Sequence, residues 1–181
     1  IAKDEKTVLQ RSYTEFEYAY YTLIAIVYSI AFLTIMPFVK IYTSGVTDIN
    51  YNIPLLGFLF VLDGLLYNIK TPQGMLVISA GMFKETRAQV KIYGLITVIV
   101  EFILTPTMGI YGVLIASIVS NVYRDIDLMF FIPKPVTSLP VVNTAKRILL
   151  IFISAIIIYL PFVKLEINPA GYIQWIMYAL C

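Results

Sequence analysis

Long apolar runs separated by short polar connections are the main pattern of this chain. A helix needs about 20 mostly apolar residues to cross the roughly 30 Å hydrocarbon core of a bilayer. Runs that meet or approach this length occupy residues 18–36, 54–80, 88–104, 110–132 and 148–163, and another begins at residue 172. We expect Pro37 to end the first run, because proline interrupts the hydrogen-bond ladder of a helix. The pattern predicts an all-α, polytopic bundle of membrane-spanning helices.

Composition narrows the chemistry of this bundle. Of the 181 residues, 60% are apolar and 13% are charged, which suits a chain surrounded by lipid. No histidine and a single cysteine, Cys181, exclude His-based catalysis and an internal disulfide framework, so we expect no cofactor and no metal. A net charge of +2 is too small to indicate a nucleic-acid partner. Because the chain begins with Ile1 and ends within an apolar run, we expect an interior piece of a longer protein.

Basic residues alternate between the two predicted sides of the membrane. The N-terminal tail and the second and fourth connections hold nine of them, against two in the first and fifth connections, Lys40 and Lys164. The nine are Lys3, Lys6, Arg11, Lys84, Arg87, Lys91, Lys134, Lys146 and Arg147. Since basic residues near helix ends stay in the cytoplasm, both ends of the chain are predicted to be cytoplasmic. An interfacial aromatic belt is predicted at the start of the first helix, from Tyr13, Phe16, Tyr18, Tyr20 and Tyr21.

The second apolar run contains a cation and a helix breaker, Lys70 and Pro72. At about 1.5 Å per residue, Lys70 lies roughly 24 Å along this helix, inside the bilayer. Asp63, Tyr67, Lys70 and Gly74 follow i, i+4, i+7, i+11 spacing and form one stripe. Intramembrane charges usually face a bundle interior or a wet cavity. The stretch predicts a kinked or broken helix that lines a cavity, with Lys70, Asp63 and Tyr67 as candidate substrate-binding residues. The alternative is that Lys70 snorkels or pairs structurally with Asp63.

A second candidate cation, Arg124, lies in the fourth apolar run. It is roughly 21 Å from the start of that helix, a depth similar to that of Lys70, so the two cations together indicate an anion site. Asp127 follows three residues later and could instead neutralise Arg124 locally. On the same helix Gly112, Ala116 and Ser120 repeat small residues every four positions, a pattern typical of close helix packing.

Glu101, in the third run, is either an interfacial charge or a weak candidate for ion coupling. It lies four residues after Thr97 and near Pro106, toward the predicted outer surface. No sequence repeat accompanies these motifs.

Three phrases in order along residues 37–127 resemble one family. They are "PFVKIYTSGVTDINY", "NIKTPQGMLVISAGMFKETR" and "GIYGVLIASIVSNVYRDID". They are similar to the polysaccharide-type (O-antigen and capsule) flippases of the multidrug/oligosaccharidyl-lipid/polysaccharide exporter superfamily. The resemblance implies a two-lobe, MATE-like transporter in the bacterial plasma (inner) membrane. Residues 1–135 would be the later part of the C-terminal lobe, residues 136–181 a linker with two additional spans, and the N-terminal lobe would be missing.

The resemblance also implies a substrate. Such flippases move an undecaprenyl-diphosphate-linked oligosaccharide from the cytoplasmic to the outer leaflet for surface polysaccharide biosynthesis, and many are coupled to ion gradients. Lys70, in "NIKTP", and Arg124, in "VYRDID", match positions where relatives often carry a basic residue. Thr97 stands where many relatives carry Asn, and Glu101 lies outside the family pattern.

Three alternatives stay open at this point. A multidrug or metabolite antiporter of the same superfamily would line its cavity with acidic and aromatic residues rather than basic ones. A membrane enzyme would show a large polar loop with clustered catalytic residues, but the longest outer connection, residues 37–53, has Asp48 as its only acid. A structural membrane scaffold fits the apolar content but leaves the Lys70 stripe unexplained.

Overall fold

The fold is described from a computed structural model, over residues 3–46, 50–132, 136–162, 169 and 171–180. The predicted features that involve Asp48, Lys134, Lys164 and Cys181 lie outside these residues. Within the described ranges the regular elements are helices: α1 (Lys3–Tyr42), α2 (Pro54–Ile69), α3 (Thr71–Ser79), α4 (Arg87–Met108), α5 (Ile110–Phe131), α6 (Val141–Phe162) and α7 (Tyr172–Leu180). The all-α prediction is confirmed for this part of the chain.

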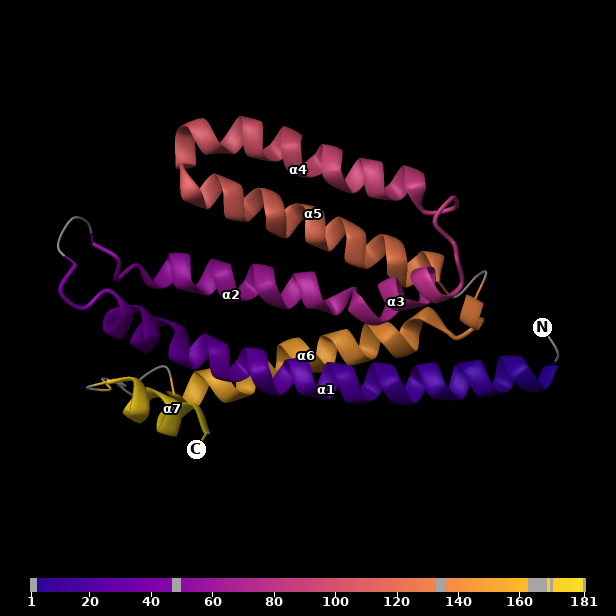
Figure 1. The fold of residues 1–181 in the computed structure, drawn as a ribbon, viewed down its shortest axis with the longest axis horizontal. Coiled ribbons are helices and arrows are strands. Elements are labelled where there is room, and N and C mark those ends of the chain that lie inside the picture. The colour runs from indigo at the N-terminus through magenta and orange to yellow at the C-terminus, as the bar shows by residue number, and fades with distance from the viewer. Residues whose placement is uncertain (1–2, 47–49, 133–135, 163–168, 170, 181) are drawn as a thin grey trace.

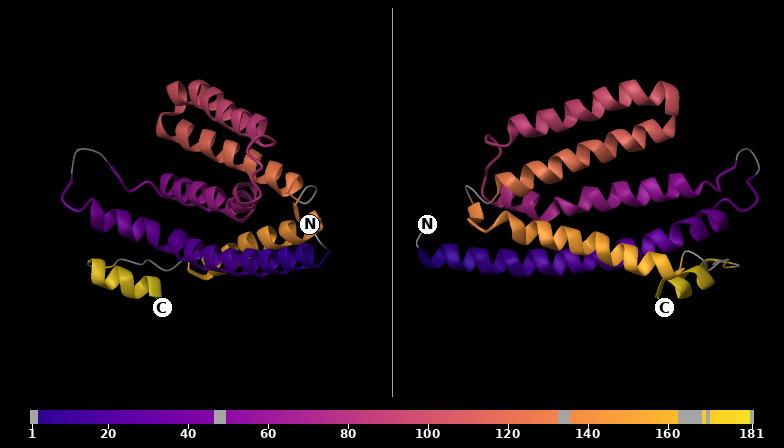
Figure 2. Two further views of the ribbon diagram at one scale, coloured as in Figure 1. Left: turned by 45° about the vertical axis from the view of Figure 1, so that its right-hand side comes forward. Right: turned by 180° about the vertical axis from the view of Figure 1, so that it is seen from behind.

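The helices run back and forth along one long axis (Figure 1). Helix α4 packs on α5, α5 on α2 and α2 on α1, while α6 lies along α1 and α7 against its C-terminal part. Figure 2 shows the same stacking from two further sides. Consecutive long helices point in opposite directions, so the N-terminus and the α3–α4 and α5–α6 connections gather at one end (Figure 1). The clustering of basic connections at one end follows from this topology, whereas their cytoplasmic orientation stays a prediction.

Within the described ranges, four helical stretches are long and apolar enough to cross a membrane: Glu5–Tyr42, Pro54–Ser79, Arg87–Met108 and Val141–Leu160. They are compatible with a multi-pass membrane protein. Helix α5 has the same 22-residue length as α4 but carries Arg124, Asp125 and Asp127 in its second half. Helix α7 spans nine residues in the structure. The outer face of α4 is apolar and exposed, with Phe102 at 82% of its full accessibility, as expected for a surface that meets lipid or another helix.

Two predicted helix boundaries are wrong. Pro37 does not end the first helix, since α1 continues five residues further to Tyr42 with Pro37 inside it. A proline removes one backbone donor, and membrane helices tolerate that loss where neighbouring groups satisfy the backbone. Helix α6 begins at Val141, seven residues before the predicted start. Lys146 and Arg147 therefore belong to a helix instead of a connection, which gives Arg147 a packing partner described below.

The predicted break at Lys70 is confirmed. Lys70 ends α2 and precedes α3, with φ −76° and ψ −7°. Pro72 falls in the first turn of α3, where a missing backbone N–H costs little because the first N–H groups of a helix have no intrahelical partner. The Lys70 carbonyl accepts the first backbone hydrogen bond of α3, from Gly74 N–H at 2.8 Å. The two arms of the break, α2 and α3, pack in different hydrophobic cores. Leu65 and Ile69 of α2 pack with α1 and α6, and Leu76 and Val77 of α3 pack with the end of α5.

The α4–α5 hairpin is closed by backbone contact at Gly112, as the small-residue stripe predicts. A Cβ atom on Gly112 would lie 2.6 Å from the Leu104 carbonyl carbon and 2.7 Å from Thr105 N. We expect Gly112→Ala to lower the free energy of unfolding by about 1–3 kcal/mol, because backbone atoms cannot move aside as a flexible side chain can. Thermal unfolding in detergent measures the effect.

Gly94→Ala is the matched control for the hairpin. Gly94 lies in α4, and a Cβ there would have no heavy atom within 4 Å. Alanine should keep or raise stability there, since glycine is about 1 kcal/mol worse than alanine in a helix. Equal melting temperatures for the two variants would contradict the close approach at Gly112.

Candidate functional site

The helix break directs Lys70 toward α5. Its Nζ donates a hydrogen bond to Asn121 Oδ1 at 2.6 Å. The same ammonium lies 4.3 Å from the centroid of the Tyr67 ring, within cation–π range. A second ring, that of Tyr93 on α4, has its centroid 5.7 Å away. Lys70 and Tyr67, two predicted site residues, are thus in contact, and Tyr67 keeps 59% of its surface exposed.

Asn121 on α5 connects this group and was not predicted from the sequence. Its Oδ1 also accepts a hydrogen bond from the Tyr93 hydroxyl at 3.2 Å, and its Nδ2 donates to Asp63 Oδ1 at 2.9 Å. Asn121 is 1% exposed and makes polar contacts with α2, α4 and the residue at the break. Asp63 therefore reaches Lys70 through Asn121, and no direct ion pair joins the two among the described residues. The sequence did contain one indication of this role for Asn121: it is an amide, one turn before Arg124, in an otherwise apolar helix.

Arg124 lies one turn beyond Asn121, and its charge is already compensated. Its side chain is 10% exposed, and its Nη1 donates to Asp127 Oδ2 at 2.5 Å. This is the local neutralisation that the spacing allowed as an alternative. Because Asn121 contacts Lys70 and lies one turn before Arg124 on α5, the two cations lie in the same region of the molecule.

Asp125, the neighbour of Arg124 in α5, faces α2 and α6. Both of its carboxylate oxygens are inaccessible and have no hydrogen-bond partner among the described residues. It lines a cavity of about 370 Å³ between α2, α5 and α6, whose other walls are apolar, including Leu66, Ile69 and Phe152. Three carboxylates, those of Asp63, Asp125 and Asp127, thus lie on the same parts of α2 and α5 as Lys70 and Arg124.

The remaining predicted residues are not part of this cluster. Glu101 lies two turns beyond Tyr93 on α4, about 12 Å along the helix, and has no hydrogen bond or ion pair within the described residues. Thr97 donates to Ser120 Oγ at 2.8 Å, which makes both of them packing contacts of the α4–α5 hairpin. A Cβ on Gly74 would meet no atom within 4 Å, so that end of the stripe is open.

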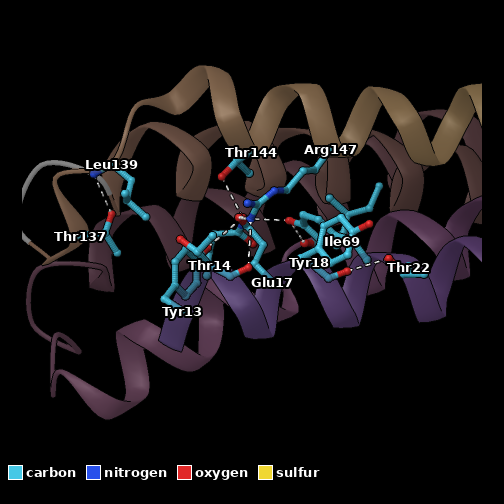
Figure 3. Close-up of polar contacts among 12 residues, drawn as sticks. Tyr13, Thr14, Glu17, Tyr18, Thr22, Ile69, Thr137, Leu139, Thr144 and Arg147 are labelled. Carbon is cyan, nitrogen blue, oxygen red and sulfur yellow. Dashed lines mark hydrogen bonds and ion pairs between the residues drawn. The ribbon is translucent and has the colours of Figure 1, made fainter. Parts of the chain in front are cut away.

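A second polar cluster, centred on Glu17, was also missed by the sequence reasoning (Figure 3). Glu17 is 1% exposed, and its carboxylate forms an ion pair with Arg147 of α6. Its Oε1 accepts hydrogen bonds from Tyr13 at 3.0 Å and Thr144 at 2.8 Å. A carboxylate this deeply buried is retained in a fold only when it is paired and hydrogen-bonded, and here both conditions hold.

The predicted aromatic belt is partly wrong. Tyr18 and Phe16 are exposed, at 65% and 39%. Tyr13 and Tyr21 are buried instead, at 7% and 3%, and Tyr20 donates a hydrogen bond to Asn68 Oδ1 at 3.0 Å. Because α1 packs on both α2 and α6, tyrosines at the spacing of a helical turn face those helices and not the membrane interface.

The fold and the two clusters define a class: an all-helical chain, compatible with a multi-pass membrane protein, in which a broken helix places a lysine in a polar cluster. Comparison of the chain with protein-family models, with curated proteins and with solved structures finds no match. Among the described residues no group of three or more His, Cys, Asp or Glu could hold a metal ion.

Proposed function

We propose that this chain is part of a transporter that flips a lipid-diphosphate-linked oligosaccharide from the cytoplasmic to the outer leaflet for surface polysaccharide biosynthesis. The observation that carries the proposal is the setting of Lys70. A lysine ammonium has three N–H donors. One goes to Asn121, and the other two have no hydrogen-bond acceptor among the described residues, with the Tyr67 ring beside them. Those two donors are free for an anion.

The physical chemistry of Lys70 suits a diphosphate. Hydrogen bonds between an ammonium and a phosphate oxygen are charge-assisted and about twice as strong as neutral ones. A half-buried site strengthens them further, since the effective dielectric constant is lower than in water. Arg124 is paired with Asp127 and therefore adds little net positive potential. The substrate class thus rests on Lys70 as the direct contact.

The neighbours of Lys70 suit a sugar. Sugar hydroxyls both donate and accept hydrogen bonds, so a sugar site needs donors and acceptors together. Asp63 offers carboxylate oxygens, and Tyr67 offers a hydroxyl and an exposed ring beside the ammonium. The apolar lipid chain would stay in the bilayer while the head group passes along this face. In the two-lobe arrangement that the resemblance implies, the missing lobe faces this site and rocking exposes it to alternate sides.

A second candidate function, a multidrug or metabolite antiporter of the same architecture, is favoured by one observation. Three carboxylates lie on the same parts of α2 and α5 as Lys70 and Arg124, and Asp125 has no hydrogen-bond partner within the described residues. This region has one more acidic than basic side chain: the acids are Asp63, Asp125 and Asp127, and the bases are Lys70 and Arg124. An acidic, aromatic site is the expected feature of a transporter for cations.

Reconstitution of the full-length protein in liposomes tests both candidates. We expect protein-dependent movement of a fluorescent undecaprenyl-diphosphate-linked oligosaccharide between leaflets, and slower movement of the same oligosaccharide on undecaprenyl monophosphate, which offers Lys70 less negative charge. A cationic dye is the second substrate. Dye export without flipping would replace the flippase by the antiporter, and absence of both activities would overturn both proposals.

A further inference from the structure

One tyrosine hydroxyl joins the two arms of the helix break. Tyr21 of α1 donates a hydrogen bond to the carbonyl oxygen of Ile69, the last residue of α2, at 3.0 Å. The same hydroxyl accepts a hydrogen bond from Gln73 Nε2, in the first turn of α3, at 2.8 Å. Lys70 lies between these two residues in the chain. Tyr21 therefore fixes the backbone on one side of Lys70 and a side chain on the other.

Burial of the Gln73 side chain at this place has an energetic cost. It is 3% exposed, and its Oε1 has no hydrogen-bond partner among the described residues. A buried polar atom without a partner costs about 1–3 kcal/mol. An apolar residue of similar size would avoid this cost but would lose both bonds of Nε2, to Tyr21 and to Glu17 Oε1 at 3.3 Å. The amide is thus explained by the link that its nitrogen makes and not by stability.

The Glu17 cluster anchors this link to α6. The Glu17 carboxylate accepts a hydrogen bond from Thr144 and forms an ion pair with Arg147, both on α6. Arg147 Nη1 also donates a hydrogen bond to the Thr14 carbonyl at 3.4 Å. Figure 3 shows Arg147 and Thr144 converging on Glu17, with Ile69 in the same group of side chains. A continuous set of polar contacts therefore runs from α6 through α1 to both arms of the break.

Rotation at the break would move the lysine. Among the described residues, the backbone hydrogen bond from Gly74 N–H to the Lys70 carbonyl is the first of α3, and it does not tie α3 to α2. The Lys70 side chain must reach Asn121 Oδ1 on α5 at 2.6 Å, and a shift of α2 against α3 changes that reach. Side chains that fix both arms determine where the ammonium points.

We propose that Tyr21 is a positioning residue of the Lys70 site: with Gln73 and Glu17, it holds the break in the geometry that presents the Lys70 ammonium to a diphosphate group. The inference rests on the proposed function for the identity of the ligand. It assigns the N-terminal half of α1, and the α6 helix packed on it, to the binding site, although no described residue of either helix has a hydrogen bond to Lys70.

The test uses inorganic pyrophosphate as the probe and the full-length protein in nanodiscs, with affinity measured by calorimetry. Tyr21→Phe should weaken binding about five- to tenfold, because one hydroxyl with two hydrogen bonds is lost while the ring is kept. Tyr20→Phe is the matched control. It deletes the neighbouring hydroxyl, which bonds to Asn68 on α2 and leaves α3 untouched, and should change affinity less than about twofold. Equal effects of the two variants would overturn the proposal.

A double-mutant cycle with Lys70→Gln separates positioning from a general effect on the fold. If Tyr21 acts through Lys70, then Tyr21→Phe should have no further effect on affinity in the Lys70→Gln background. If Tyr21→Phe lowers pyrophosphate affinity by the same factor in both backgrounds, then Tyr21 acts elsewhere and the proposal is rejected. Should Tyr21→Phe fail to accumulate, Gln73→Met removes the bridge from the other arm and is expected to give the same result. Unchanged pyrophosphate affinity in Lys70→Gln alone would instead reject the proposed function, so the two failures are distinguishable.

Discussion

Replacing Lys70 with Ala should remove surface polysaccharide from cells that depend on the full-length protein, while the amount of that protein in the membrane stays the same. The charged contact that is lost contributes about 1.5–3 kcal/mol, which corresponds to a roughly 10- to 100-fold fall in transport rate. The fold should persist, because Asn121 keeps its hydrogen bonds to Tyr93 and Asp63. Immunoblots of surface polysaccharide and of membrane fractions measure the two quantities.

Two further variants serve as controls for this result. Lys84→Ala removes an exposed lysine from the α3–α4 connection and should leave polysaccharide at its normal level. Lys70→Arg keeps the positive charge but not the compact ammonium that fits Asn121, so partial activity is expected. Normal polysaccharide in the Lys70→Ala strain would show that the lysine is structural, and the substrate site would then lie outside this cluster.

Replacing Glu17 with Ala should lower the free energy of unfolding by about 3–5 kcal/mol, the largest stability effect that we expect in this chain. The Arg147 side chain is 20% exposed and would lose its counter-ion, and Tyr13 and Thr144 would lose their acceptor. A buried cation without a partner costs more than the pair contributes, since its desolvation is no longer offset. Thermal unfolding in detergent, followed by circular dichroism, measures the change.

The exposed ion pair two residues earlier provides the control. Glu15 pairs with Arg11 at 2.9 Å, with exposed fractions of 65% and 83%, and Glu15→Ala should change stability by less than about 1 kcal/mol. Glu17→Gln combined with Arg147→Met removes both charges, while the carbonyl of the introduced amide can still accept hydrogen bonds. This double variant should recover more than half of the lost stability. No recovery would mean that the geometry of the carboxylate, and not the unpaired charge, determines the cost.

Helix α6 packs directly on α1. The resemblance places residues 136–181 in a linker with two additional spans, outside the transporter lobe proper. In the structure α6 lies along α1, and its Arg147 and Thr144 complete the Glu17 cluster. If Tyr21 positions Lys70 as proposed, then removal of α6 should weaken the site without touching any residue that contacts the substrate.

The sequence by itself determined the local features. The apolar periodicity predicted helices, Lys70 and Pro72 predicted the break, and the spacing of Gly112, Ala116 and Ser120 predicted a close helix contact. Each of these depends on residues within a few turns of one another, and helical geometry alone relates them. The pairing of Arg124 with Asp127, three residues apart, was foreseeable as an alternative for the same reason.

The tertiary structure decided which polar residues meet across helices. Asn121 lies 51 positions from Lys70, and Arg147 lies 130 positions from Glu17, so no spacing rule along the chain relates them. Their pairing depends on the packing order of α4, α5, α2, α1 and α6, and that order follows from the apolar faces of all the helices together. For the same reason Tyr21 could be predicted as an aromatic on a helix but not as the bridge across a break 48 residues away.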